Sequence, residues 1–355
     1  MSTAPAAVHL DELWFTRCPV PTATGIAADR GALGAEFAAD GIRVRSFQDD
    51  RERDLNERHF THEHRTLIRE GGNVPALWAR SRGTDTRLIG LTWIEERQVI
   101  LIRPGDGPRS PAELRGRRLA VPRHPIAVDF WAAMALRGFA GALGVAGLRL
   151  ADARPVDVPA GPEHPGQWAA ELAALVRGDV DAVYAKGALA VESARRHGVE
   201  VGIELDDESD LRSRINNGTP RPVTVAGWLL EHRPDVVDRF LAVLVEAADW
   251  AAAHPADVGR ILAAETGAST AGVAGAYRTG QHLGLHLDLS EERLDLLAAQ
   301  EHFLRAHDFL AAPVDVRGWA DPEPLRRAHE LAARRQQNPA PAGSTVPSPT
   351  DRTGE

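Results

Sequence analysis

The chain has 355 residues, of which 43% are hydrophobic and 26% are charged, and its formal net charge is -9. This is an ordinary globular composition, and the length allows two lobes with separate cores. A negative charge without a basic stripe argues against nucleic acid or an anionic membrane as a partner, so a small anionic ligand needs a local cationic pocket.

Short β-branched segments alternate with Ala- and Leu-rich amphipathic segments along the chain. We predict strands at 13–18, 42–47, 86–93 and 199–205, helices at 24–41, 73–83, 126–144, 188–198, 234–254 and 290–310, and a helix followed by a strand in 167–187. This alternation predicts an α/β fold of two lobes, each a mainly parallel sheet flanked by helices.

The order of these segments also predicts how the lobes are divided. We expect residues 1–121 and 223–335 to form a first lobe with the C-terminal helices, and residues 122–222 to form an inserted second lobe. Residues 336–355 are rich in Pro, Ser, Thr and Gly, and we expect a disordered tail there.

The N-terminal segment bears on the location of the protein. It lacks an early basic residue and an apolar run, and it carries Asp11 and Glu12 shortly before the single cysteine, Cys18. No later segment has the roughly 20 apolar residues that span a bilayer, and one cysteine forms neither an internal disulfide nor a cysteine-based zinc site. We expect a cytoplasmic protein with an unmodified thiol.

Cys18 is the first candidate for chemistry. It follows a predicted strand and precedes a predicted helix, and ligands of open α/β sheets bind beyond such strand ends. Pro19 and Pro21 stiffen the turn and would hold the thiol in one orientation, and a nearby helix N-terminus favours the thiolate. The alternative is a small buried hydrophobic residue, the commoner role of a lone cysteine.

A second candidate is the turn that follows Arg69. Gly71 and Gly72 allow close approach of the backbone to a ligand, Asn73 suits a helix N-cap, and the free amides of the turn form an anion site beside a guanidinium. The alternative is an ordinary helix start with a solvated arginine.

Three histidines, His59, His62 and His64, precede this turn. They complete no recognised metal-binding pattern, so we expect no metal. One of them is a candidate proton partner for Cys18, as in Cys–His pairs, and the sequence does not select which one.

The segments CPVP, HFT and RxGG, in this order, resemble the 2'-hydroxybiphenyl-2-sulfinate desulfinase family, which is similar in fold to type II periplasmic substrate-binding proteins for sulfonates and taurine. The segments SPAELRGRRLAV and GDVDAVY extend the resemblance over nearly the whole chain. It departs from the family at His62, where a tyrosine is expected, and at Glu70, which replaces an apolar residue.

The resemblance implies hydrolytic release of sulfite from an aromatic sulfinate. It assigns catalytic roles to Cys18, His59 and Arg69, with Arg69, Gly71 and Gly72 holding the sulfinate. Candidates for an apolar wall around the ring are Trp14, Phe15, Phe60, Trp78, Trp93, Trp131 and Trp228, of which Phe60 and Trp14 are the predicted substrate contacts.

We also expect a monomer without a cofactor. Cys18 acts either as a thiol that protonates the ring carbon or as a thiolate that attacks sulfur. The rival function is that of a non-catalytic sulfonate- or taurine-binding protein of a transporter, or of a cytoplasmic protein that binds small anions.

Overall fold

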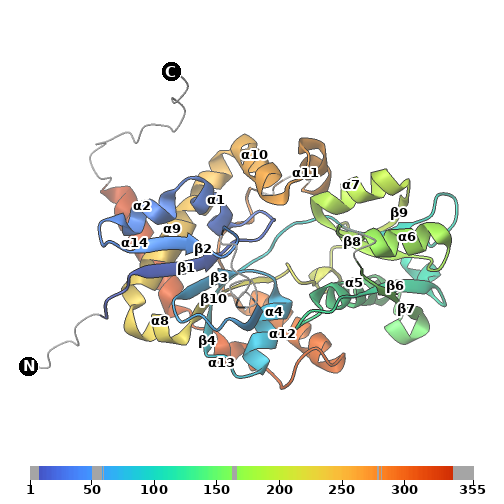
Figure 1. Ribbon diagram of the computed structural model, residues 1–355, viewed down its shortest axis with the longest axis horizontal. Helices are drawn as coiled ribbons and strands as arrows, with labels where there is room; N and C mark the ends of the chain where they lie inside the picture. The colour runs from blue at the N-terminus through green and yellow to red at the C-terminus, as the bar shows by residue number, and fades with distance from the viewer. Residues whose placement is uncertain are drawn as a thin grey trace, which may run out of the picture.

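The computed structural model describes residues 8–49, 58, 60–161, 166–277, 280 and 282–338. Two lobes lie side by side along the longest axis, each built around a sheet (Figure 1). The α/β, two-lobed architecture expected from the sequence is confirmed. Within the described ranges, every helix is too short or too polar to cross a lipid bilayer.

The sheet of the first lobe has the strand order β2-β1-β3-β10-β4. Its strands are β1 (Glu12–Thr16), β2 (Arg43–Ser46), β3 (Leu67–Glu70), β4 (Thr86–Thr92) and β10 (Arg221–Ala226). β1 is parallel to β2 and β3, whereas β10 is antiparallel to both β3 and β4. Four strands therefore run in one direction, and β10 runs in the other.

The second lobe repeats this topology. Its strands are β5 (Gln98–Ile102), β6 (Arg118–Arg123), β7 (Arg154–Pro159), β8 (Val183–Lys186) and β9 (Glu200–Glu204). β5 is antiparallel to β8 and β9, β6 is parallel to β7, and a parallel bridge between Leu119 and Ala182 joins the two groups. In both lobes the antiparallel strand is the one that follows the crossing from the other lobe.

Helices cover the first sheet on both faces (Figure 1). They are α1 (Ala23–Asp29), α2 (Ala32–Ala38), α4 (Asn73–Ser81), α8 (Gly227–His232), α9 (Pro234–Ala253), α10 (Pro255–Thr266), α12 (Glu291–Ala306), α13 (Val316–Trp319) and α14 (Glu323–Gln337). The single helix predicted at 24–41 is two helices, because Gly31 between them has a left-handed φ of 68°. The main core lies under α9, where Phe240 packs against Phe15 of β1.

The helices of the second lobe are α5 (Phe130–Val145), α6 (Ala169–Arg177) and α7 (Gly187–His197), with short 3-10 helices at Pro111–Leu114, Leu150–Asp152 and Leu211–Arg214. From the sequence we expected all later helices to pack on the first lobe, and one of them also contacts the second lobe. α11 (Thr270–Ala276) packs against α7, so the C-terminal region contacts both lobes.

The pairing of the strands indicates where the chain crosses from one lobe to the other. β4 ends in the first sheet at Thr92, β5 begins in the second sheet at Gln98, and the chain returns to the first sheet at Arg221. This pairing favours a crossing between β4 and β5, earlier than the expected limit at residue 121. The division into domains at 122 and 222 itself stays a prediction.

The predicted tail at 336–355 begins inside a helix. α14 continues through Gln336 and Gln337, and its basic last turn carries Arg334 and Arg335. Basic side chains at this end of a helix interact favourably with its dipole. Residues 339–355 lie outside the described residues.

Candidate active site between the lobes

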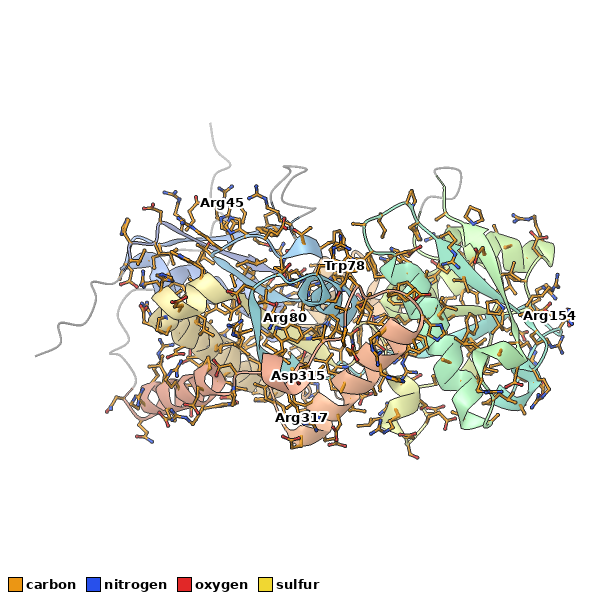
Figure 2. The ribbon with its side chains drawn as sticks, turned by 90° about the horizontal axis from the view of Figure 1, so that it is seen from below. Arg45, Trp78, Arg80, Arg154, Asp315 and Arg317 are labelled. Carbon is orange, nitrogen blue, oxygen red and sulfur yellow. The ribbon has the colours of Figure 1, made fainter. Side chains whose placement is uncertain are left out.

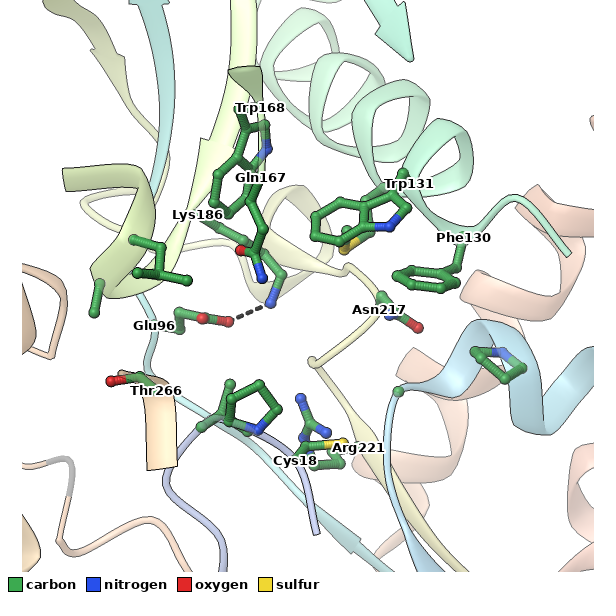
Figure 3. A pocket seen from close by; sticks show the side chains of 18 of the residues that line it. Cys18, Glu96, Phe130, Trp131, Gln167, Trp168, Lys186, Asn217, Arg221 and Thr266 are labelled. Atoms are coloured by element: carbon green, nitrogen blue, oxygen red, sulfur yellow. Dashed lines mark hydrogen bonds and ion pairs between the residues drawn. The ribbon is translucent and has the colours of Figure 1, made fainter. Parts of the chain in front are cut away.

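A cavity of about 300 Å³ lies between the lobes and is lined by both of them and by the segments that cross between them (Figure 3). The first lobe contributes the loop after β1, the end of β3 and the start of α4. The second lobe contributes α5, the residues before α6 and the end of β8. The cavity thus lies beyond the carboxyl ends of β1, β3 and β8, where open α/β sheets bind ligands.

Cys18 lines this cavity from the loop between β1 and α1. Its half-buried sulfur lies 3.7 Å from the Glu70 carbonyl oxygen, to which the thiol donates a weak hydrogen bond. The Val20 amide donates to the Cys18 carbonyl at 2.7 Å and closes a tight turn around Pro19. The thiol is therefore held at the cavity surface by a stiff backbone, and the half-buried residue packs against the edge of the main core.

Arg69 reaches the cavity from β3, although the residue is only 1% exposed. Its Nη1 donates to the Gly72 carbonyl at 3.1 Å. Burial lowers the pKa of Arg69 to about 10; the Cys18 charge opposes this shift, and the Arg221 charge adds to it. Arg69 is therefore charged at neutral pH in an environment nearly free of water, where its electrostatic effect on an anion is large.

Gly71 makes room for this guanidinium. A Cβ atom at Gly71 would lie 2.5 Å from the Arg69 Cζ, closer than side-chain atoms pack. Its amide, expected to bind the anion, donates instead to the Pro222 carbonyl of β10 at 3.2 Å. Gly71 thus leaves space for the guanidinium while its amide is used within the protein, and its expected role in holding the anion stays a prediction.

The start of α4 is capped by Asn217, which comes from the segment that returns from the second lobe. The Asn217 carbonyl accepts from the Asn73 amide at 2.7 Å, and its Oδ1 accepts from the Val74 amide at 2.9 Å. Asn73 is therefore not the N-cap; its side chain donates to Asn216 and Pro220 carbonyls. The expected row of free amides is mostly occupied.

Gly72 is the N-cap of α4 and lines the cavity. A Cβ atom there would lie 2.4 Å from the Asn217 Oδ1, so only glycine allows this close approach. No described residue accepts a hydrogen bond from the Gly72 amide. It is therefore the one amide of the predicted turn that remains available to a ligand in the described part of the chain.

Glu70 is buried beside Arg69 without lining the cavity. Its Oε2 accepts from Thr24 Oγ1 at 2.5 Å and from the Thr24 amide at 3.2 Å, and its Oε1 accepts from Thr92 Oγ1 at 3.4 Å. Burial raises the pKa of Glu70, and the hydrogen bond from Thr24 opposes that rise. The carboxyl thus joins α1, β3 and β4 below the site.

Three charged residues that sequence analysis did not select also line the cavity. Glu96 lies in the crossing between the lobes and forms an ion pair with Lys186 at the end of β8 (Figure 3). Arg221 is the first residue of β10. The Pro-rich segment around it signals a turn before a strand, but its place beside β3 depends on antiparallel pairing, which the sequence pattern does not reveal.

Aromatic rings form a continuous wall along the cavity. Phe60 stacks on Phe130 with 5.8 Å between ring centroids, Phe130 lies 5.1 Å from Trp131, and Trp131 meets Trp168 edge-on at 5.7 Å. All four rings line the cavity. Offset and edge-on pairs of this kind are favourable arrangements, and together the rings give the cavity an apolar wall.

Only two of the seven aromatic candidates, Phe60 and Trp131, line this cavity. Trp14 packs on the outer side of the first sheet in a small cluster with Phe47 and Leu67. The Arg45 guanidinium covers its ring at 4.4 Å, and Figure 2 shows Arg45 at the outer surface of the first lobe. Trp14 therefore does not line the cavity, and its expected contact with the substrate stays a prediction.

His59, the predicted partner of Cys18, lies outside the described residues. His62 is buried, and the ring of His64 lies 5.6 Å from that of Trp14, away from the cavity. Burial lowers the pKa of His64. The role assigned to His59 stays a prediction.

Among the described residues, the acidic side chains of Glu204, Asp206 and Asp207 bring carboxylate oxygens within 4.8 Å of one another. None of them lines the cavity. This surface group has no part in the site described above.

No protein-family model matches the chain. The sequence is 30% identical over 361 residues to the 2'-hydroxybiphenyl-2-sulfinate desulfinase of Rhodococcus erythropolis, covering 90% of this chain and 93% of that protein. The desulfinase of the same name from Rhodococcus qingshengii gives the same values.

Solved structures support the same relationship. The crystal structure of a cysteine-to-serine variant of DszB in complex with biphenyl-2-sulfinic acid has a TM-score of 0.71 and 26% identity, covering 91% of this chain and 100% of that chain. The periplasmic aliphatic sulphonate-binding protein SsuA of Escherichia coli has a TM-score of 0.65 and 17% identity, covering 88% and 93% of the two chains.

The SsuA likeness concerns the fold alone, and it confirms the expected resemblance to type II periplasmic binding proteins. The desulfinase likeness extends over nearly all of both chains in sequence and in structure. By this identity and coverage, the chain belongs to the 2'-hydroxybiphenyl-2-sulfinate desulfinase family.

Proposed function

We propose that this protein is an aryl sulfinate desulfinase, a hydrolase that cleaves a carbon–sulfur bond and releases sulfite. The observation that carries the proposal is that the Cys18 thiol and the buried Arg69 guanidinium line one aromatic-walled cavity. Membership of a family whose relatives are named sulfinate desulfinases supports the same reaction.

In this proposal Arg69 and the Gly72 amide bind the sulfinate oxygens. A guanidinium presents paired N–H donors that match two oxygens of one head group, and a buried charged hydrogen bond of this type contributes about 2 kcal/mol. The Gly71 amide is already used by the Pro222 carbonyl, so Gly71 acts by leaving room for Arg69.

The aromatic ring of the substrate would lie against Phe60, Phe130, Trp131 and Trp168. A cavity of about 300 Å³ lies at the small end of the range for ligand pockets, which suits a compact aryl group. The related DszB variant was crystallised with biphenyl-2-sulfinic acid, which makes a biphenyl sulfinate the first substrate to assay.

The reaction converts an aryl sulfinate and water to an arene and hydrogensulfite. In one route the Cys18 thiol protonates the ring carbon, the carbon–sulfur bond breaks, and sulfur dioxide leaves. Water then adds to sulfur dioxide to give hydrogensulfite and a proton, which restores the thiol. In the other route the thiolate attacks sulfur, the aryl group leaves with a proton from water, and water cleaves the sulfur–sulfur bond of the intermediate.

The contact between Cys18 and the Glu70 carbonyl supports the first route. A carbonyl oxygen only accepts hydrogen bonds, so this contact needs the protonated thiol. His59 is proposed as the partner that returns the proton to Cys18.

The test is release of sulfite and arene in equal amounts from biphenyl-2-sulfinate by the wild-type protein and by Cys18→Ser. We expect loss of turnover in Cys18→Ser with nearly unchanged thermal unfolding, since Cys18 is only half-buried at the edge of the core and serine is of similar size. Near-normal turnover in this variant would rule out the proposed chemistry. Mass spectrometry of quenched protein separates the routes, because only the thiolate route adds sulfur dioxide to the Cys18 peptide.

The rival function is a binding protein without catalysis, which the SsuA fold permits. Tight binding of sulfinates or sulfonates by the wild-type protein with no sulfite release would support that function. The cytoplasmic location and the monomeric state expected from the sequence stay predictions.

A further inference from the structure

Arg221 is a buried cation, and two of its guanidinium nitrogens have no hydrogen-bond acceptor among the described residues. It begins β10, lines the cavity and is only 4% exposed. Its Nε and Nη1 atoms are buried, and no acceptor among the described residues binds them. A guanidinium carries five N–H donors and remains charged, and leaving buried donors without partners is costly. An arginine of this kind needs an acceptor from outside the chain.

The topology places Arg221 at the same end of the sheet as the catalytic candidates. Because β10 runs antiparallel to β3, its first residues lie where β3 ends, with Val223 opposite Glu70. Figure 3 draws Arg221 and Cys18 at one end of the cavity. Gly218 gives the guanidinium space, since a Cβ there would lie 3.0 Å from Arg221 Nη2.

The charges around this end of the cavity are not balanced. Arg69 and Arg221 contribute two cations, and the charge of Arg221 contributes to lowering the pKa of Arg69. Glu70 has its oxygens occupied by threonine donors; burial raises its pKa, and the Arg221 charge opposes part of that rise. Glu96 is paired with Lys186. An anion bound near both guanidinia would remove their repulsion and supply the missing acceptors.

We infer that Arg221 is a second ligand of the anionic head group and binds the sulfinate of the substrate, and the sulfite product, together with Arg69. This inference rests on the proposed function in one respect, that the head group is a sulfinate. Sulfite carries more negative charge than a sulfinate near neutral pH and fits between two cations. Inorganic sulfite is therefore expected to compete with substrate for the same site.

The experiment measures binding separately from turnover. Biphenyl-2-sulfinate and, separately, sodium sulfite are titrated calorimetrically into Cys18→Ser and into Cys18→Ser combined with Arg221→Met. The Arg221→Met change should weaken the binding of both compounds by at least about tenfold, and by similar factors, because the contact is to the head group they share.

Arg137→Met is the matched control. Arg137 is also buried, but it does not line the cavity, and it donates to Gln300 at 3.2 Å and to the Arg212 carbonyl at 2.9 Å. Its loss should lower the unfolding temperature without a selective loss of affinity for either compound. If Arg221→Met does not fold, Arg221→Gln takes its place, with the same tenfold loss expected.

Affinities within twofold of the parent protein for both compounds would overturn the inference. The same holds if only biphenyl-2-sulfinate binding weakens, because the contact would then be to the ring. If binding depends on Arg221 but the wild type releases no sulfite, the desulfinase proposal is wrong and Arg221 is still an anion ligand. If the wild type releases sulfite but binding does not depend on Arg221, the desulfinase proposal stands and the inference about Arg221 is wrong. Binding of neither compound by Cys18→Ser or by the wild type would overturn both.

Discussion

The two sides of the cavity are built in different ways. The first lobe supplies the sulfur of Cys18 and the guanidinium of Arg69 from loops and strand ends, and the backbone holds both. The second lobe supplies Trp131 from the first turn of α5 and Trp168 from the residue before α6. One side carries the groups that meet a charged head group, and the other carries an apolar surface.

Burial sharpens this contrast. Arg69 and Arg221 are 1% and 4% exposed, whereas Phe130 and Trp131 are half-buried on the opposite wall. The charged side therefore has little freedom to adjust, and the aromatic side has more. Under the proposed function, the head group would meet residues of the first lobe, and the ring would meet Phe130, Trp131 and Trp168 of the second lobe together with Phe60 of the first.

The largest expected effect is on the first-lobe side, from Arg69→Lys. A point charge does not reproduce the paired donors of a guanidinium, so we expect the KM for an aryl sulfinate to rise ten- to a hundredfold, equivalent to about 2 kcal/mol. Steady-state kinetics measure it. Gly71→Ala should act in the same direction, because its Cβ would lie 2.5 Å from the Arg69 Cζ and displace the intact guanidinium.

Arg137→Lys and Gly34→Ala are the matched controls for these two variants. Arg137 is buried outside the cavity, and a Cβ at Gly34 would meet nothing within 4 Å. Both should keep the KM of the wild type. An unchanged KM in Arg69→Lys would contradict the assignment of Arg69 as the head-group clamp.

A smaller effect is expected on the aromatic side, from Trp131→Ala. Loss of its contacts with Phe130 and Trp168 should lower kcat/KM for biphenyl-2-sulfinate about fivefold, since an aromatic contact contributes about 1 kcal/mol. The value for methanesulfinate, which has no ring, should change little. Equal losses for both compounds would contradict the division of roles between the lobes.

Trp228→Ala controls for the loss of a large ring. Trp228 is half-buried in the first lobe, where it stacks on His232 at 4.8 Å, and it does not line the cavity. Its removal should leave the ratio of the two kcat/KM values at the wild-type level.

The last prediction concerns the pH dependence of stability in the second lobe, which is measured by unfolding and not by kinetics. Burial raises the pKa of Glu171, in the first turn of α6, from 4.5 to about 7, and Asp129 adds to the rise. The folded state therefore holds this proton more tightly than the unfolded state does. The contribution of Glu171 to the free energy of unfolding is fully present below pH about 4.5. It is lost as the pH rises through about 7, by at most about 3 kcal/mol.

Glu171→Gln removes this titration. At pH 8 the unfolding temperature of the variant should therefore exceed that of the wild type by a few degrees, and at pH 4 it should not exceed it. Glu323→Gln is the control, because the exposed Glu323 has its pKa lowered by a hydrogen bond from Arg326 and should give no gain at pH 8. Equal gains at both pH values for Glu171→Gln would contradict the assignment.

Sequence patterns were sufficient for the parts of the protein that depend on local order. Alternating β-branched and amphipathic segments predicted the two-lobed α/β fold. The strand predicted before Cys18 placed this residue beyond the carboxyl end of a strand, where the structure has it. The family resemblance suggested Trp14 as a substrate contact, but its ring packs with Phe47 and Leu67 and does not line the cavity. A strand's period of two residues does not say which face meets the ligand.

Residue order alone thus determined which groups follow strands: a stiff proline turn after Cys18 and paired glycines after Arg69. Only the tertiary structure decided how these groups are used. The antiparallel insertion of β10 beside β3 brings Arg221 into the cavity, lets Pro222 take the Gly71 amide, and lets Asn217 cap α4. These contacts join residues about 150 positions apart, and strand pairing at that separation depends on packing of the whole sheet, not on any local pattern.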